Sequence, residues 1–229
     1  MSSQTSSSLK VDRTTKTLRE LTLEKMRDAI FNGHFQPGER LIERSLCEQL
    51  DVSRSVVREV LRHLETEGLV ETIAHQGPVV AVLDADKAAQ IYELRALLEG
   101  HAARICAEKA SDEVIRQLDA LNARTQEAFA QRDFQEVLVR TSAFYEAMFK
   151  GAGLTMAWSI VQSLNARINR LRAMTISTSG RSTEAAAEME RIMSALRRRD
   201  PQKAQEASEA HVRRVAQIVA ERLEAQAMK

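Results

Sequence analysis

The stretch SRSVVREVLRHLETEGLV, residues 53–70, decides the fold of the first part of this sequence. Its apolar residues predict a helix over 54–67 and share one buried face: Val56, Val57, Val60, Leu61 and Leu64. A second stripe, at four-residue spacing, is the arginine face: Arg54, Arg58 and Arg62. Ser53 precedes the helix as its N-cap, and Gly68 follows it as a left-handed cap. The stretch therefore predicts a capped amphipathic helix with a cationic face.

Short elements surround this helix on both sides. The upstream residues predict helices over 18–31 and 43–50, separated by a turn at Pro37-Gly38. The downstream residues predict two short strands, over 69–73 and 79–82. Three helices followed by a hairpin make a winged helix-turn-helix, in which the third helix enters the major groove of DNA.

A helical bundle is expected for the rest of the chain, which has no proline between Val79 and Asp200. Six helices are predicted there, over roughly 85–109, 112–131, 133–150, 153–176, 183–198 and 201–226. The fold class is therefore mostly α. We expect a disordered tail over 1–10, a winged helix-turn-helix over 11–83 and an all-α antiparallel bundle over 84–229, with Asp84 capping its first helix.

Composition excludes several classes of protein. With 33 basic and 32 acidic residues, the net charge is +1, so the chain is no uniformly basic nucleic-acid coat. Only 8 glycines and 3 prolines are present, which disfavours all-β folds and glycine-rich phosphate loops. Cys47 and Cys106 form no disulfide framework and no C-x-x-C zinc motif. No apolar run reaches the ~20 residues of a membrane helix, so we expect a cytoplasmic protein without a membrane partner.

Taken alone, the arginine face is more typical of a solvated helix than of a DNA-binding one. The order and spacing of residues on both sides of this helix strengthen the DNA-binding interpretation. These residues are Ala29-Ile30, Gly33, Pro37-Gly38, Leu41, Ser53-Arg54, Val57-Arg58-Glu59, Leu61, Leu64, Glu67-Gly68-Leu69-Val70 and Gly77. This pattern resembles the GntR family of bacterial transcription regulators. The resemblance covers most of residues 30–80 and implies that the domain binds double-stranded DNA.

The resemblance implies which residues contact DNA. The base and phosphate contacts fall on Arg44, Arg54 and Arg58, with Gly77 at the tip of the wing. The N-cap Ser53 and its neighbour Ser55 are further candidates, because helix N-termini bind phosphate. Arg62 receives no such support, and His75 and Gln76 fit an ordinary polar loop equally well.

The helical remainder resembles the FCD effector domain of the FadR-like branch of that family. The matching residues are Tyr92-Glu93-Leu94-Arg95, Glu99, Ala102-Ala103, Ala143-Phe144 and His211. In many members an aspartate and three histidines hold a divalent metal there. Counted along this chain, those four positions are Thr141, Tyr145, Met189 and His211. Threonine, tyrosine and methionine are poor ligands for such ions, so we predict that the family's metal site is lost and that no cofactor binds.

The same positions are candidates for an effector pocket, lined by Arg95, Thr141, Tyr145, Met189 and His211. A partly buried Arg95 needs a carboxylate, which either an internal glutamate such as Glu93 or Glu99 or an organic-acid effector could supply. The pocket could instead suit a less polar ligand, and His211 fits an ordinary buried histidine equally well. The arginines at 167, 170 and 172 are expected on a solvated face, unless one projects inward.

These features predict a non-enzymatic transcription regulator that binds a palindromic operator as a homodimer, under the control of a small-molecule effector. A helical-bundle enzyme with an accessory DNA-binding head is an alternative, although the sequence offers no nucleophile with an adjacent base and no phosphate loop. A winged-helix module that binds another protein is the second alternative. Whether the protein represses or activates stays open.

Overall fold

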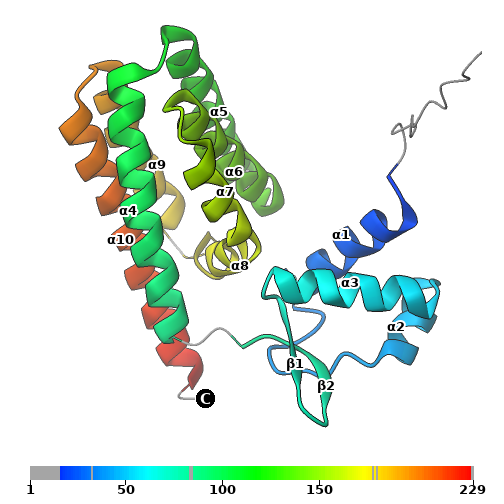
Figure 1. Cartoon of the computed structure of the whole chain (residues 1–229). Coiled ribbons are helices and arrows are strands. Elements are labelled where there is room, and N and C mark those ends of the chain that lie inside the picture. The colour runs from blue at the N-terminus through cyan, green and yellow to red at the C-terminus, as the bar shows by residue number, and fades with distance from the viewer. Residues whose placement is uncertain (1–15, 32, 83–84, 177, 179, 228–229) are drawn as a thin grey trace, which may run out of the picture. The chain divides into compact units, whose positions relative to one another are not determined.

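The computed structural model describes residues 16–31, 33–82, 85–176, 178 and 180–227 (Figure 1). The tail predicted over 1–10 and the domain boundary and helix cap predicted at 83–84 lie outside these residues. The described residues form two compact units, one made of 16–66 with 70–80 and the other of 67–69 with 81–227.

The first unit consists of three helices and a hairpin. Its elements are α1 (Leu18–Phe31), α2 (Glu43–Leu50), α3 (Arg54–Thr66), β1 (Val70–Ile73) and β2 (Gly77–Val80). Both α1 and α2 pack against α3, and the apolar residues at helical spacing form the shared core, with Met26, Leu46 and Leu64 almost fully buried. The predicted winged helix-turn-helix is confirmed, with the helices within one residue of their expected ends.

The hairpin begins its second strand earlier than predicted, at residue 77 rather than 79. The strands are antiparallel, with Val70 opposite Val80 and Ile73 opposite Gly77. Pro78 lies inside this strand although proline has no N–H to donate to a ladder. Its carbonyl oxygen instead accepts a hydrogen bond from Leu41 N at 2.8 Å. The polar backbone groups of Pro78 therefore face Leu41 and not β1, so the missing N–H does not interrupt the pairing of the two strands.

The second unit is an all-helical bundle, as predicted. Its elements are α4 (Ala85–Lys109), α5 (Asp112–Gln131), α6 (Phe134–Gly151), α7 (Thr155–Ser163), α8 (Asn165–Ile176), α9 (Arg181–Arg197) and α10 (Pro201–Ala227). The long helices α4 and α10 run side by side, and α5 packs against α6 (Figure 1). One apolar core joins these helices, and Cys106, Leu118, Phe149 and Met193 are fully buried in it.

The helix predicted over 153–176 is wrong in one respect, because it is broken into α7 and α8 at Leu164. Near the break, Ser163 Oγ donates to the Ile160 carbonyl at 2.7 Å, and Leu164 N donates to the Val161 carbonyl at 3.1 Å. Serine and asparagine side chains compete with helical backbone hydrogen bonds, which favours a helix end at Ser163 and Asn165. In the part of the chain that the structure describes, no helix is both long and apolar enough to span a membrane.

Candidate nucleic-acid interface and ligand cavity

Helix α3 divides into a buried and an exposed face. Val57, Val60 and Leu64 are at most 1% exposed and pack into the core of the first unit. The arginine face, Arg54, Arg58 and Arg62, lies on the exposed side. A helix that is held by its apolar face presents its cationic face to a partner without further rearrangement.

The N-terminus of α3 gathers small polar groups beside Arg54. Val56 N donates to Ser53 Oγ at 3.4 Å, so Ser53 caps the helix as expected. The hydroxyls of Ser53 and Ser55 lie 2.8 Å apart, and both residues are exposed. Exposed hydroxyls at the positive end of a helix make a site that favours a phosphate.

The other two predicted DNA-binding arginines are held by nearby carboxylates. Arg58 Nε donates to both oxygens of Glu43, at 2.9 and 3.0 Å, which links α3 to α2. Arg44 Nε donates to Glu48 one turn later on α2, at 3.1 Å. The side chains of Arg58 and Arg44 are 59% and 81% exposed, and such exposed pairs contribute little to stability. Both arginines can therefore exchange their carboxylate for a phosphate or a base.

Gly77 lies beside the tip of the wing and not at it. Residues 74–76 form the turn, and Gly77 is the first residue of β2. Its φ of +83° is the left-handed conformation that favours glycine, although a Cβ there would meet no atom within 4 Å. The prediction of Gly77 at the tip is wrong because the strand starts early, and His75 and Gln76 occupy the turn instead.

The second unit contains the bundle cavity, a space of about 70 Å³ between its helices. Four of the five predicted effector residues line it: Arg95, Thr141, Met189 and His211. Tyr145 does not line it and is 1% exposed. The centroid of its ring lies 5.9 Å from the guanidinium carbon of Arg95. Positions that the family resemblance implied, on four separate helices, therefore line one cavity.

Arg95 forms an ion pair with an internal glutamate, which is one of the two partners that the sequence left open. Its Nε and Nη2 donate to the two carboxylate oxygens of Glu99, at 2.8 and 3.2 Å, and both side chains are almost fully buried. Burial opposes the charge of Arg95, but Glu99 outweighs it and raises the arginine pKa. Within the described residues, Arg95 Nη1 and the hydroxyls of Tyr92 and Tyr145 are buried without a hydrogen-bond partner.

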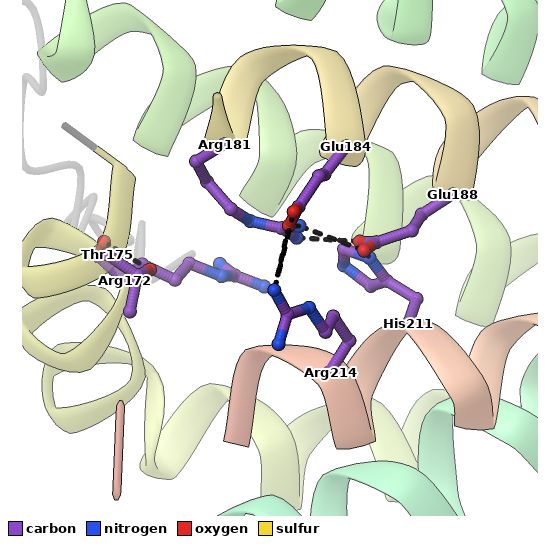
Figure 2. Close-up of polar contacts among 7 residues, drawn as sticks. All are labelled: Arg172, Thr175, Arg181, Glu184, Glu188, His211 and Arg214. Carbon is purple, nitrogen blue, oxygen red and sulfur yellow. Dashed lines mark hydrogen bonds and ion pairs between the residues drawn. The ribbon is translucent and has the colours of Figure 1, made fainter. Parts of the chain in front are cut away.

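A second buried network, which the sequence analysis missed, joins α9 to α10 (Figure 2). Arg181 donates to both oxygens of Glu188, at 2.9 and 2.6 Å, and His211 Nδ1 lies 2.6 Å from Glu188 Oε2. Burial alone would raise the Glu188 pKa, but the hydrogen bonds from His211 and Arg181 lower it to about 2. The carboxylate is therefore ionised and accepts only, so His211 Nδ1 carries the proton. The signal was the spacing of Arg181 and Glu188, seven residues apart on one helix face.

The residues around the bundle cavity do not fit a divalent metal. Thr141 and Met189 stand at two of the ligand positions, and His211 is the single imidazole among them. Glu188 is the nearest carboxylate to His211, but Arg181 occupies both of its oxygens. In the ranges that the structure describes, no three histidine, cysteine, aspartate or glutamate side chains are grouped to hold a metal ion.

Arg172 projects inward, which is the alternative left open for the arginines at 167, 170 and 172. It lines the bundle cavity from α8 and points toward the network on α9 and α10 (Figure 2). Its guanidinium carbon lies 5.3 Å from the centre of the Tyr145 ring, and its Nη1 donates to Asn169 Oδ1 at 3.2 Å. Burial and the nearby charge of Arg95 lower its pKa to about 10, which still leaves it charged at neutral pH.

Comparison with known families matches both units. A family described as "Bacterial regulatory proteins, gntR family" matches residues 18–80, and one described as "FCD domain" matches residues 90–214. The "Nta operon transcriptional regulator" of Aminobacter aminovorans is 46% identical over 82 residues, which are 36% of this chain and 39% of that protein. The "Probable D-xylose utilization operon transcriptional repressor" of Paenarthrobacter nicotinovorans is 30% identical, over 88% of this chain and 91% of that protein.

A solved structure has the same fold. "E. coli McbR/YncC" superposes with a TM-score of 0.73 at 19% identity, over 90% of this chain and 99% of that one. At this identity the likeness concerns the fold alone. The FCD match spans more than half of the chain, the relative of Paenarthrobacter nicotinovorans aligns over most of both proteins, and the winged helix precedes the bundle. The chain therefore belongs to the GntR family of transcription regulators, in the branch with a C-terminal FCD domain.

Proposed function

We propose that this regulator binds a palindromic operator as a homodimer and that a small molecule in the bundle cavity controls its affinity for that operator. The observation that carries the proposal is the arginine face of α3, exposed on a helix whose opposite face is buried. Arg54 stands at the positive end of this helix, where it can grip the O6 and N7 atoms of a guanine with two hydrogen bonds.

The small size of one winged helix supports a symmetric dimer. One winged helix contacts a few base pairs, so a second copy on a related half-site supplies the remaining affinity and specificity. Two-fold symmetry is the commonest arrangement of homo-oligomers, and it requires an operator with inverted half-sites. Around each half-site, Arg44, Arg58 and the two serines at the start of α3 would contact phosphates or bases.

The bundle cavity supports control by a ligand. A ligand that binds one arrangement of the dimer better than another changes operator affinity by a coupling of about 1–3 kcal/mol, which is about 5- to 150-fold. We propose that this control works without a metal, because the chemistry of Thr141, Met189 and His211 does not suit one.

A gel-shift titration with the DNA upstream of the protein's own gene tests the DNA-reading role. Arg54→Ala should weaken specific binding by about 5- to 150-fold, the value of one bidentate base contact. Arg62→Ala, on the same face but two turns farther along, is the matched control and should weaken specific and random DNA equally. Equal binding by wild type and Arg54→Ala, with the same salt dependence, would contradict the assignment and favour a protein-interaction module.

The same titration tests the dimer. A probe with both half-sites should bind two chains in one step and far more tightly than a probe with one half-site. Binding of one chain per probe, with equal affinity for the two probes, would exclude the proposed symmetric complex.

A further inference from the structure

The ion pair between Arg58 and Glu43 uses one nitrogen of the guanidinium. Arg58 Nε donates to Glu43 Oε1 at 3.0 Å and to Glu43 Oε2 at 2.9 Å. Among the residues that the structure describes, the two terminal nitrogens of Arg58, Nη1 and Nη2, have no hydrogen-bond partner. The side chain is 59% exposed, so the N–H groups on these nitrogens are available to an incoming ligand.

The core of the winged helix anchors both residues of this pair. On α3, Arg58 lies between Val57 and Val60, which are each 1% exposed. On α2, Glu43 lies one turn before Leu46, which is 2% exposed. The two helices pack against each other, so a pair that joins them fixes the direction of the guanidinium relative to the rest of the first unit.

The Arg44–Glu48 pair does not fix its arginine in this way. Arg44 Nε donates to one oxygen of Glu48, at 3.1 Å, and both residues lie on α2. Their side chains are 81% and 66% exposed, whereas the side chain of Glu43 is 34% exposed. A single hydrogen bond between two exposed side chains leaves both of them free to rotate. The first unit therefore contains two arginine–glutamate pairs of the same charge, of which one fixes the direction of its guanidinium.

We propose that Glu43 is a positioning residue for DNA recognition, which holds Arg58 by Nε so that Nη1 and Nη2 donate together to the O6 and N7 atoms of one guanine. These two acceptors lie side by side on the major-groove edge of the base, and a two-pronged contact with arginine is the commonest specific contact there. Arg58 need not leave Glu43 to make it. The inference rests on the proposed function in taking α3 as the helix that enters the major groove, and it names the base that Arg58 reads.

The carboxylate of Glu43 also opposes binding that is independent of sequence. Phosphates carry no sequence information, so an arginine that turns to the DNA backbone adds affinity for every sequence alike. Glu43 occupies Nε of Arg58 and repels phosphates by its own charge, which leaves the edge of a base as the favoured partner. Removal of this carboxylate should therefore raise the affinity for random DNA and reduce the discrimination between bases.

Binding of the full-length protein to operator duplexes tests the proposal, when one guanine of each half-site at a time is replaced by 7-deazaguanine, which lacks the N7 acceptor. In wild type, one replacement should weaken binding about fivefold or more, and the same replacement should have no effect in Arg58→Ala, which identifies the guanine that Arg58 reads. In Glu43→Ala this replacement should weaken binding by less than about twofold. Glu43→Gln keeps one acceptor oxygen for Nε, so its discrimination should lie between that of Glu43→Ala and that of wild type.

Glu48→Ala is the matched control, because it removes the same charge from the same helix, beside Arg44. Both alanine variants should bind random DNA more tightly than wild type, since each removes one negative charge. Glu48→Ala should nevertheless keep the full wild-type discrimination at the guanine that Arg58 reads. The ratio of the affinities for the two duplexes cancels the effect of net charge, so it reports the direction of the guanidinium.

Two results would overturn the proposal: no guanine whose replacement distinguishes wild type from Arg58→Ala, or wild-type discrimination in Glu43→Ala. If Glu43→Ala does not fold, Glu43→Gln decides, and wild-type discrimination in that variant overturns the proposal. Specific operator binding with either of these results refutes this inference alone. A wild type that binds the operator no better than random DNA refutes the proposed function, and this inference with it.

Discussion

Two arginine–glutamate ion pairs, one in each unit, differ in burial and therefore in how easily they can be broken. In the winged helix, Arg58 donates to both oxygens of Glu43, and the two side chains are 59% and 34% exposed. In the bundle, Arg95 donates from both Nε and Nη2 to the two oxygens of Glu99, and the two side chains are 2% and 0% exposed. Each pair joins one guanidinium to both oxygens of one glutamate, but the burial of the two pairs differs. Exposure makes the first pair exchangeable, and burial makes the second a fixed part of the core.

The difference in burial explains why an arginine pair is exchangeable in the winged helix and fixed in the bundle. At the surface, water solvates both partners, so a phosphate can replace a carboxylate at little cost. In the bundle, water does not solvate either partner, so removing one of them leaves a buried charge without a counter-ion. Arg172 lies between these limits, since it is half-buried and has no carboxylate.

The largest effect should come from breaking the buried pair. Glu99→Gln leaves Arg95 charged and without a counter-ion, and should lower the free energy of unfolding of the bundle by about 3–5 kcal/mol. Urea unfolding followed by tryptophan fluorescence measures it, because Trp158, on α7, is the only tryptophan of the chain.

The control for Glu99→Gln is an exposed pair on α5. Glu113→Gln removes the same charge from beside Arg116, where the side chains are 80% and 68% exposed, and should leave the urea midpoint almost unchanged. The double variant Arg95→Met with Glu99→Leu should recover part of the loss, since it leaves no buried charge. A loss for Glu99→Gln no greater than the control's would show that burial does not set the energy of the pair.

A smaller effect, in binding rather than stability, should come from the exposed pair. Glu43→Gln releases Arg58 from its carboxylate, so one more guanidinium is free to contact DNA. Operator affinity should rise a few-fold, and the slope of log affinity against log salt should steepen by up to about one phosphate contact. Gel shifts at several salt concentrations measure both quantities. Glu24→Gln removes an equal charge from α1 and should leave the slope unchanged. An unchanged slope in Glu43→Gln as well would mean that Arg58 does not contact phosphate.

Local chemistry in the sequence predicted most of the fold and only part of the cavity. Helix α2 was predicted with its observed ends and α3 to within one residue, because Ser53 and Gly68 are capping residues whose effect is local. The break at Leu164 was missed, because serine and asparagine are tolerated inside helices and stop one only in certain contexts.

The residues of the cavity were also predicted only in part. Thr141, Met189 and His211 were placed around one site by resemblance to a family, and they do line one cavity. The Arg181–Glu188 pair was not foreseen, because an arginine near a helix start is usually solvated. The seven-residue spacing of Arg181 and Glu188 places both on one face of α9, but it does not show that this face turns inward, which depends on how α8 and α9 pack.

The smallest effect should appear in the pH dependence of stability. Burial is the largest influence on His211 and lowers its pKa below the usual value of 6.5, although Glu188 opposes this. The unfolded chain therefore binds a proton at a higher pH than the folded one, so stability is full above pH 6.5 and falls as the pH drops below it. Glu188, with a pKa of about 2 against 4.5 unfolded, adds a second loss only below pH 4.5.

Urea midpoints of the bundle at pH 7.5, 6.5 and 5.5 separate the two groups, because Glu188 stays ionised throughout that range. Wild type should lose stability across it with a slope below about 1.4 kcal/mol per pH unit, the limit for one proton. His211→Gln, whose amide can still donate to Glu188, should lose less over the same interval. His101→Gln, which removes an exposed histidine from α4, should follow wild type. If His211→Gln and wild type fell in parallel, the buried histidine would not be the titrating group, and the loss would have to arise at exposed sites where pairing is weak.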